Sequence, residues 1–173
     1  DVEPIDIPTA ELFASDEWEW SLPENLGPVV NSQGSIDAPT LSPDGLQLIV
    51  QHWIPQPEVL LYRRESRTAP WRPGIPLGKE FEDGIHWPKL DRSGQLLIAP
   101  RVNTGGFSAG NRLMQARPAP PPLYWTDWQP VFPDEVEGMF HHSPGVLSVD
   151  GMTLYFGSER PGGPGQADIW MAR

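Results

Sequence analysis

Two adjacent histidines, His141 and His142, are the residues of this sequence that most invite a chemical role. Imidazole is a common metal ligand, and its charge changes near neutral pH. Neighbouring residues on a strand point to opposite faces, however, so the pair is unsuited to holding one ion together. A zinc site needs three or four converging ligands, and His52 and His86 belong to other parts of the sequence. We therefore expect no metal site, and either packed imidazoles or a pH-sensitive surface.

Clustered carboxylates are the second candidates for chemistry. A glycoside hydrolase needs two carboxyl groups held between roughly 5 and 9.5 Å apart. Two short acidic segments could supply them, one with Glu82 and Asp83 and one with Asp134, Glu135 and Glu137. Acidic residues in loop-like segments are more often simply solvated. A hydrolase is therefore the alternative function, and the first expectation is that the protein is not an enzyme.

Neither a phosphate-binding loop nor a reactive thiol occurs in the sequence. The glycine-rich run at 162–165 has no Gly-Lys-Ser/Thr after it, so it is not a phosphate loop. There is no cysteine to provide a thiolate or a disulfide. We accordingly expect no cofactor and no catalytic residue.

The formal net charge is −11, and the acidic excess lies entirely in the N-terminal third. Residues 1–62 carry eleven acidic side chains and no Lys or Arg, whereas residues 63–173 carry twelve of each sign. An acidic surface repels phosphate backbones, so nucleic acid is not an expected partner. No stretch approaches the roughly 20 apolar residues that span a bilayer, so we expect no membrane insertion. Residues 1–19 are interpreted as an acidic N-terminal lead-in.

The composition favours strands. With 22 Pro and 17 Gly among 173 residues, long helices are disfavoured, and many short strands joined by turns are expected. Eight Trp indicate a packed fold. One helical turn is expected at residues 9–14, where Thr9 would cap its start. The sequence therefore predicts an all-β fold.

A repeat of about fifty residues organises the chain. Its clearest landmark is a polar turn that ends in glycine and leads into an apolar strand, at residues 41–50, 90–99 and 147–156. The structural residues of these turns are Asp44, Gly45, Gly94, Asp150 and Gly151. The glycines follow one another at spacings of 49 and 57 residues, and glycine accepts the positive φ that hairpin turns need. We expect the three glycines to occupy equivalent turns.

Two further landmarks recur in the same order. Trp20, Trp71 and Trp125 each precede a turn and are followed six residues later by Leu or Val. A second apolar strand follows each turn, at residues 59–64, 112–117 and 168–173. The repeats span approximately 20–70, 71–124 and 125–173, with about four short strands in each.

Such units stack radially into a propeller, typically of about 4–8 blades, so three repeats predict part of a larger ring. Its open sides should expose apolar faces that further propeller blades or another subunit would cover.

The repeats resemble a known family. Residues 39–48, Pro-Thr-Leu-Ser-Pro-Asp-Gly-Leu-Gln-Leu, are similar to the WD40-like β-propeller repeat of TolB and of many bacterial envelope proteins, and residues 147–170 resemble its full consensus. The second repeat departs from the pattern, with Arg92, Ser93 and Gly94 in its turn. The resemblance implies a non-catalytic scaffold for protein–protein or ligand binding, in the periplasm or cell envelope of a bacterium.

The repeat also predicts which end of the blades binds a partner. The Asp-Gly turn enters a strand at one end, so the loop that leaves this strand lies at the other end, in residues 51–58, 100–111 and 157–167. These exit loops differ from one another while the strands are alike, as in many binding surfaces, although unconstrained loops would vary in the same way. The candidate binding residues are His52, Trp53, Arg101, Asn103, Phe107, Glu159 and Arg160. The alternative, a glycoside hydrolase or another hydrolase, would place carboxylates at the propeller axis.

Overall fold

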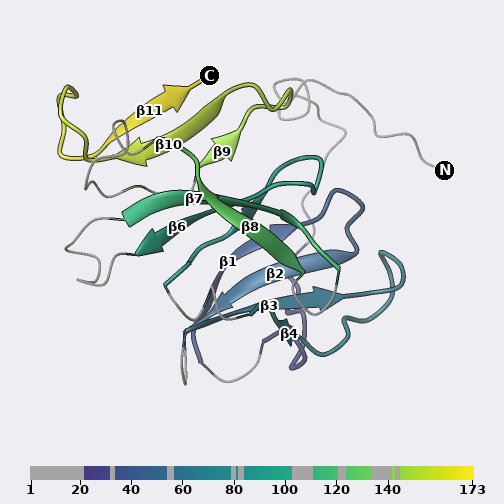
Figure 1. Ribbon diagram of the computed structural model, residues 1–173. Helices are drawn as coiled ribbons and strands as arrows, with labels where there is room; N and C mark the ends of the chain where they lie inside the picture. The colour runs from purple at the N-terminus through teal and green to yellow at the C-terminus, as the bar shows by residue number, and fades with distance from the viewer. Residues whose placement is uncertain are drawn as a thin grey trace, which may run out of the picture.

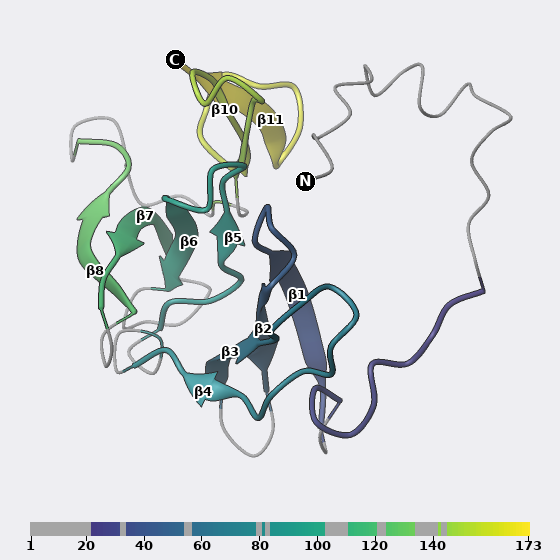
Figure 2. The ribbon, with the colours of Figure 1, turned by 90° about the vertical axis from the view of Figure 1, so that its right-hand side faces the viewer.

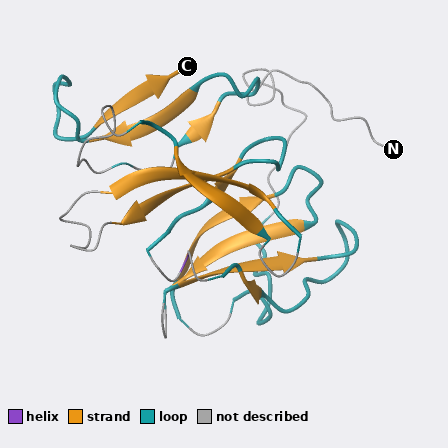
Figure 3. Ribbon diagram, viewed as in Figure 1, coloured by secondary structure: helices purple, strands orange, loops and turns teal. Residues whose placement is uncertain are grey.

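The computed structural model (Figure 1) describes residues 22–31, 34–53, 57–78, 81, 84–102, 111–120, 124–133, 142 and 145–173. Within this part of the chain the regular elements are strands joined by turns and loops, and Phe81 is the one described residue in helical conformation (Figure 3). The predicted all-β fold is confirmed. The lead-in at residues 1–19 and the helical turn expected at 9–14 lie outside the described residues.

Eleven strands form three antiparallel sheets in the described residues. The first sheet consists of β1 (Ile36–Leu41), β2 (Gln47–His52), β3 (Glu58–Arg63) and β4 (Ile75–Pro76). The second consists of β5 (Lys89–Leu90), β6 (Leu97–Val102), β7 (Asn111–Pro118) and β8 (Trp125–Pro130). The third consists of β9 (Val146–Leu147), β10 (Leu154–Ser158) and β11 (Asp168–Ala172). Each strand pairs with the next along the chain, which is the meander expected of a propeller blade.

The sheets fan out around a common inner side (Figure 2). Strands β1 and β5 lie on that inner side, and β4 and β8 lie outermost. Thr40 Oγ1 on β1 accepts a hydrogen bond of 3.0 Å from the Leu90 amide on β5. The Lys89 ammonium donates to the Pro39 carbonyl at 3.2 Å. These bonds join the inner strands of neighbouring sheets, as radial packing of blades requires.

The three turns predicted from the glycines are equivalent in the structure. Gly45, Gly94 and Gly151 each lie between the first and second strands of a sheet, with φ of 75°, 69° and 71°. In each turn the glycine N–H donates to the carbonyl three residues earlier, at 2.8 to 3.1 Å. The three glycines therefore occupy equivalent turns, each at the start of the second strand of its sheet.

The sheets and the sequence repeats are out of phase by one strand. Strand β4 follows Trp71 in the sequence but pairs with β3, and β8 begins at Trp125 but pairs with β7. The segment that opens a repeat in the sequence therefore forms the outer strand of the preceding sheet. A sequence period has no preferred starting point, so the approximate limits at 70 and 124 fall before the last strand of a sheet.

Hydrophobic cores fill the spaces between sheets. One core lies between the first two sheets and contains Ile49 and Leu97, and another lies between the second and third and contains Ile98 and Phe156. A third core, with Leu48 and Val50, covers the other face of the first sheet, against Val30 and Trp71. Successive residues of one strand thus face different cores. This explains the continuous apolar runs in β2 and β6, because both faces of these strands are covered.

Candidate binding surface at the exit end of the strands

Backbone pairing shows that the ends of β2, β6 and β10, the second strands of the three sheets, are structurally equivalent. The pairs are Ile36 with His52, Ile85 with Arg101, and His142 with Ser158. His52, Arg101 and Ser158 are therefore counterparts, each at the point where the second strand of its sheet leaves the pairing. Because direction reverses at every strand of a meander, the segment that precedes the next inner strand returns to this same end. The exit end thus combines the predicted exit loops with the segments before β5 and β9.

The predicted binding residues have different environments at this end. Arg101 and Glu159 are exposed, whereas Trp53 and Arg160 are half-buried. His52 is only 3% exposed, and its Nε2 lies 3.0 Å from the Tyr62 hydroxyl, so it belongs to the packed interior. Asn103 and Phe107 lie outside the described residues, as do His141 and the acidic segments with Glu82 and Asp134. That any of these residues binds a partner stays a prediction.

An aromatic cluster joins the first two sheets at the exit end. The ring of Trp53 lies 5.2 Å from that of His86 and 5.8 Å from that of Trp87, measured between centroids. His86 and Trp87 are themselves 5.8 Å apart. His86 and Trp87 precede β5, outside the predicted exit loops, so the sequence analysis did not place them in the site. Their place a few residues before the Gly94 turn was the signal that could have found them, because the chain reverses direction at every strand and so passes the exit end again there.

The backbone of Trp87 has a φ of 48°, which is unusual for a residue with a bulky side chain. Its counterpart in the first sheet, Ala38, has a φ of 50° and lies within β1, where the pairing with β2 shifts register between Asp37 and Thr40. The same kink therefore occurs at equivalent positions of the first two sheets. In the second sheet it presents an indole at the exit end, and strained backbone of this kind is concentrated at functional sites.

The imidazoles of this region are held in the neutral form at neutral pH. Burial lowers the pKa of His86 below its ordinary value of 6.5, and the carboxylate of Asp37 opposes this shift. Burial likewise lowers the pKa of His52, against the opposing charge of Glu58. The cluster is therefore an uncharged aromatic surface. Exposed Arg101 lies at the same end of the strands, because it pairs through its backbone with Ile85, the residue before His86.

Arg160 packs inside the molecule instead of extending from its exit loop. Its guanidinium carbon lies 5.0 to 5.6 Å from the ring centroids of Phe132, Phe156 and Trp170. Its Nε donates to Ser158 Oγ at 3.2 Å. Phe132 follows β8, so the guanidinium bridges the second and third sheets by cation–π contacts. This environment gives Arg160 a structural role.

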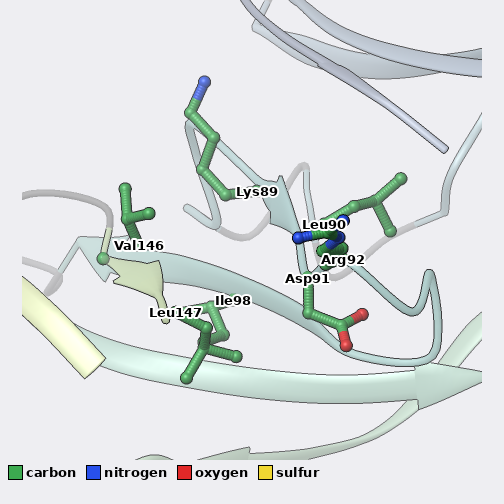
Figure 4. A pocket seen from close by; sticks show the side chains of 8 residues that line it. Lys89, Leu90, Asp91, Arg92, Ile98, Val146 and Leu147 are labelled. Atoms are coloured by element: carbon green, nitrogen blue, oxygen red, sulfur yellow. The ribbon is translucent and has the colours of Figure 1, made fainter. Parts of the chain in front are cut away.

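A pocket of about 170 Å³ lies between the inner strands β5 and β9 (Figure 4). Ile98 and Leu147 approach each other across it, whereas the Lys89 ammonium and the Asp91 carboxylate point in different directions. Asp91 is the one carboxylate among the described residues that line it, and it accepts hydrogen bonds from the amides of Gln95 and Leu96. A hydrolase site would need two carboxylates. The geometry of this pocket therefore does not favour the hydrolase alternative.

Within the described part of the chain, no three His, Asp or Glu side chains converge as metal ligands would. No helix there is long and apolar enough to cross a membrane.

Comparison with known proteins identifies the fold. No model of a protein family matches the chain, and no curated protein is detectably related to it. The solved structure of TolB from Acinetobacter baumannii superimposes with a TM-score of 0.58 over 83% of this chain, at 17% identity. The chain has the fold of a TolB-type β-propeller. A putative TolB from Agrobacterium tumefaciens is also similar, with a TM-score of 0.42, 16% identity and coverage of 84% of this chain and 60% of its own.

The match to TolB covers only 31% of the Acinetobacter protein, so this chain spans about a third of that propeller protein. Together with the three sheets, this confirms the predicted partial propeller of the TolB type. The three sheets are hereafter called blades 1, 2 and 3.

Proposed function

We propose that this chain is a non-catalytic propeller scaffold that binds a protein partner through the exit end of its blades. The observation that carries the proposal is the cluster of Trp53, His86 and Trp87 at the junction of blades 1 and 2, with exposed Arg101 at the same end of the blades. Aromatic and arginine side chains supply most of the binding energy at protein interfaces. The cluster is built on two adjacent blades, so a rigid scaffold holds it in place.

The nature of the partner follows from charge and from the fold. With a net charge of −11, the protein is unsuited to nucleic acid, and a protein or peptide surface is the better match. The similarity to TolB supports a location in the periplasm or cell envelope of a bacterium. Under this proposal the scaffold acts by presenting a surface that fits its partner, and it catalyses no reaction itself.

The proposal is tested by capturing partners from a bacterial envelope extract on immobilised protein and quantifying the purified pair. Trp53→Ala and Arg101→Ala should each weaken binding by about tenfold or more, because such truncations at hot spots commonly cost 2 kcal/mol or more. The matched controls are Gln47→Ala and Arg92→Ala at the opposite end of the blades, and they should leave the affinity unchanged. If the controls weaken binding and the exit-end variants do not, the functional face is assigned to the wrong end.

A further inference from the structure

One exposed carboxylate of blade 1 has no ionic partner in the described part of the chain. Residues 22–62 contain four acidic side chains and no Lys or Arg. One of the four, Asp37, is an exposed residue of strand β1. The one ion pair among the described residues joins Arg72 to Glu65, so Asp37 takes part in none there. Blade 1 therefore carries an unpaired negative charge on its inner strand.

The strand register places Asp37 on the face of blade 1 that meets blade 2. Asp37 pairs with Gln51 across β1 and β2, and directly opposed residues of an antiparallel pair project to the same side. Side chains alternate along a strand, so Ile49, Gln51 and Trp53 share this side. Ile49 belongs to the core between the two blades, and Trp53 contacts His86 of blade 2. Asp37 therefore lies on the same side of blade 1 as the aromatic cluster.

The charge of Asp37 reaches into blade 2. Burial lowers the pKa of His86, and the carboxylate of Asp37 opposes this shift. Burial also lowers the pKa of Lys89, again against the charge of Asp37. The Lys89 ammonium donates to the Pro39 carbonyl at 3.2 Å and forms no ion pair with this carboxylate. Asp37 thus acts on groups of the next blade, and the ammonium among them is held by a backbone carbonyl.

A buried carbonyl oxygen on the same face adds to the negative potential. Gln51 is 0% exposed, and its Nε2 donates to the carbonyls of His52 and Glu58 at 3.1 and 3.2 Å. These two acceptors fix the orientation of the amide, because only its nitrogen can donate. Among the described residues, Gln51 Oε1 receives no hydrogen bond. Its dipole therefore acts on this face together with the charge of Asp37.

A partner seated on the cluster removes water from Asp37 as well, because this carboxylate acts on His86 within the cluster. Burying a charge without a partner of opposite sign is costly, and an acidic side chain would be repelled. A cationic side chain avoids both costs. It also gains from the aromatic faces, since the quadrupole of an indole attracts a cation. The half-exposed rings of Trp53 and Trp87 supply such faces.

We propose that the cluster of Trp53, His86 and Trp87 receives a cationic side chain of the protein partner, a lysine or an arginine, which lies over an indole ring and pairs with Asp37. This inference rests on the proposed function and adds the chemistry of the residue that the partner presents. The net charge of −11 favours the approach of a basic surface in the same way.

Model compounds that differ in charge test the proposal. Nα-acetyl-lysine N-methylamide and its norleucine counterpart share an aliphatic chain, but only the lysine compound carries an ammonium group. Each is titrated into the isotope-labelled chain, and NMR follows the indole N–H signals, which Trp53→Phe and Trp87→Phe assign. The lysine compound should shift both signals and bind about tenfold more tightly than the norleucine compound. The glutamate counterpart should shift neither signal.

Charge variants of the chain provide the matched comparison. Asp37→Asn keeps the shape of the side chain and should weaken the lysine compound about tenfold, with no change for the norleucine compound. Glu159→Gln removes an exposed carboxylate from the exit end of blade 3 and should leave both affinities unchanged. Arg101→Ala should not weaken the lysine compound, and thermal melting checks that each variant folds. On the unmodified chain, added salt should weaken only the lysine compound, which tests the charge without a substitution.

Three results would overturn the proposal. They are a lysine compound that shifts neither indole signal up to its solubility limit, a norleucine compound that binds equally tightly, and an Asp37→Asn variant without effect. The same variants separate this inference from the proposed function. A captured partner whose affinity falls with Trp53→Ala but not with Asp37→Asn retains the binding face and excludes the cationic side chain. A partner insensitive to both substitutions contradicts both proposals.

Discussion

Blades 2 and 3 have the same strand order and equivalent turns, but they differ in what surrounds them. Leu113 in β7 and Ile169 in β11 occupy the same register position, and they are 0% and 78% exposed. Both are β-branched or γ-branched aliphatic residues that favour burial. The local sequence therefore specifies the strand and its register, whereas burial depends on a neighbouring blade. In a repeat protein, stability is accordingly a sum of units and interfaces.

The largest expected difference between the blades concerns this pair of positions. Leu113→Ala should lower the free energy of unfolding by about 2–5 kcal/mol, because it removes buried methyl groups and leaves a cavity. Ile169→Ala should lower it by no more than about 0.5 kcal/mol when the chain is monomeric, as is typical of surface substitutions. Chemical denaturation at low protein concentration measures both values.

The concentration dependence of the same measurement sharpens the comparison. If another subunit covers blade 3, the loss caused by Ile169→Ala should grow as the protein concentration rises, because association adds to apparent stability. The loss caused by Leu113→Ala should be present at every concentration. Equal losses for the two variants in a dilute solution would show that the face of blade 3 is covered within a single chain.

Substitution of two arginines at the exit end should change the stability of the protein by different amounts. We expect this difference to be smaller than the one between Leu113 and Ile169. Arg160 of blade 3 lies among Phe132, Phe156 and Trp170, whereas Arg101 of blade 2 is exposed. Arg160→Ala should lower the melting temperature, with a loss of about 1–2 kcal/mol from cation–π contacts and packing. Arg101→Ala should leave stability unchanged, and its effect should appear only in partner binding. An unchanged melting temperature for Arg160→Ala would restore this residue as a candidate for binding.

Much of the fold could be predicted from short-range patterns. The glycine turns require positive φ, and the apolar runs after them become β2, β6 and β10. The second set of apolar runs becomes β3, β7 and β11. These features depend on a few neighbouring residues, so the sequence alone suffices. The open face of blade 3 was also predictable, because three repeats fall short of a closed ring.

The candidate site was less predictable, because it depends on contacts between blades. The positive φ of Trp87 has no signal in the residue type, since tryptophan rarely adopts it. The contact of Trp53 with His86 joins two blades and follows from their packing. The aromatic cage of Arg160 likewise combines residues of blades 2 and 3, and the sequence alone presented this arginine as a free loop residue.

The glycine turns of blades 2 and 3 differ by an exchange of serine and aspartate side chains. In blade 3, Ser148 Oγ donates to the Asp150 carboxylate at 2.5 Å, and each side chain accepts one backbone N–H beyond the turn, from Thr153 and Met152. In blade 2 the carboxylate of Asp91 stands at the position of the serine, and the hydroxyl of Ser93 stands at the position of the aspartate. The pattern of bonds is kept although the residues are exchanged. This explains why the second repeat forms the same turn although its sequence there departs from the pattern of the other two repeats.

The pKa of the carboxylate is lowered in both arrangements. In Asp150 the hydrogen bond from Ser148 is the main cause. In Asp91 burial acts in the opposite direction, and the bonds from Ser93 and the backbone amides outweigh it. A carboxylate with a lowered pKa stabilises the folded state above its ordinary pKa of 3.8, and this contribution is lost as the pH falls through the lower folded value. The turn of blade 2 should therefore weaken in acid.

An exchange experiment tests the smallest of these differences. Asp91→Ser removes the carboxylate and should lower the free energy of unfolding at pH 7 by about 0.5–1.5 kcal/mol, the usual worth of a hydrogen bond. Ser93→Asp places two carboxylates side by side and should be destabilising through like-charge repulsion. The double variant Asp91→Ser/Ser93→Asp recreates the order found in blade 3 and should recover most of the parent's stability.

Denaturant titrations at pH 7 and near pH 3 measure all four proteins. The parent and the double variant should lose stability together in acid, and Asp91→Ser should lose less. If the two single losses simply add in the double variant, the side chains act independently and the exchange does not explain how the turn of blade 2 is maintained.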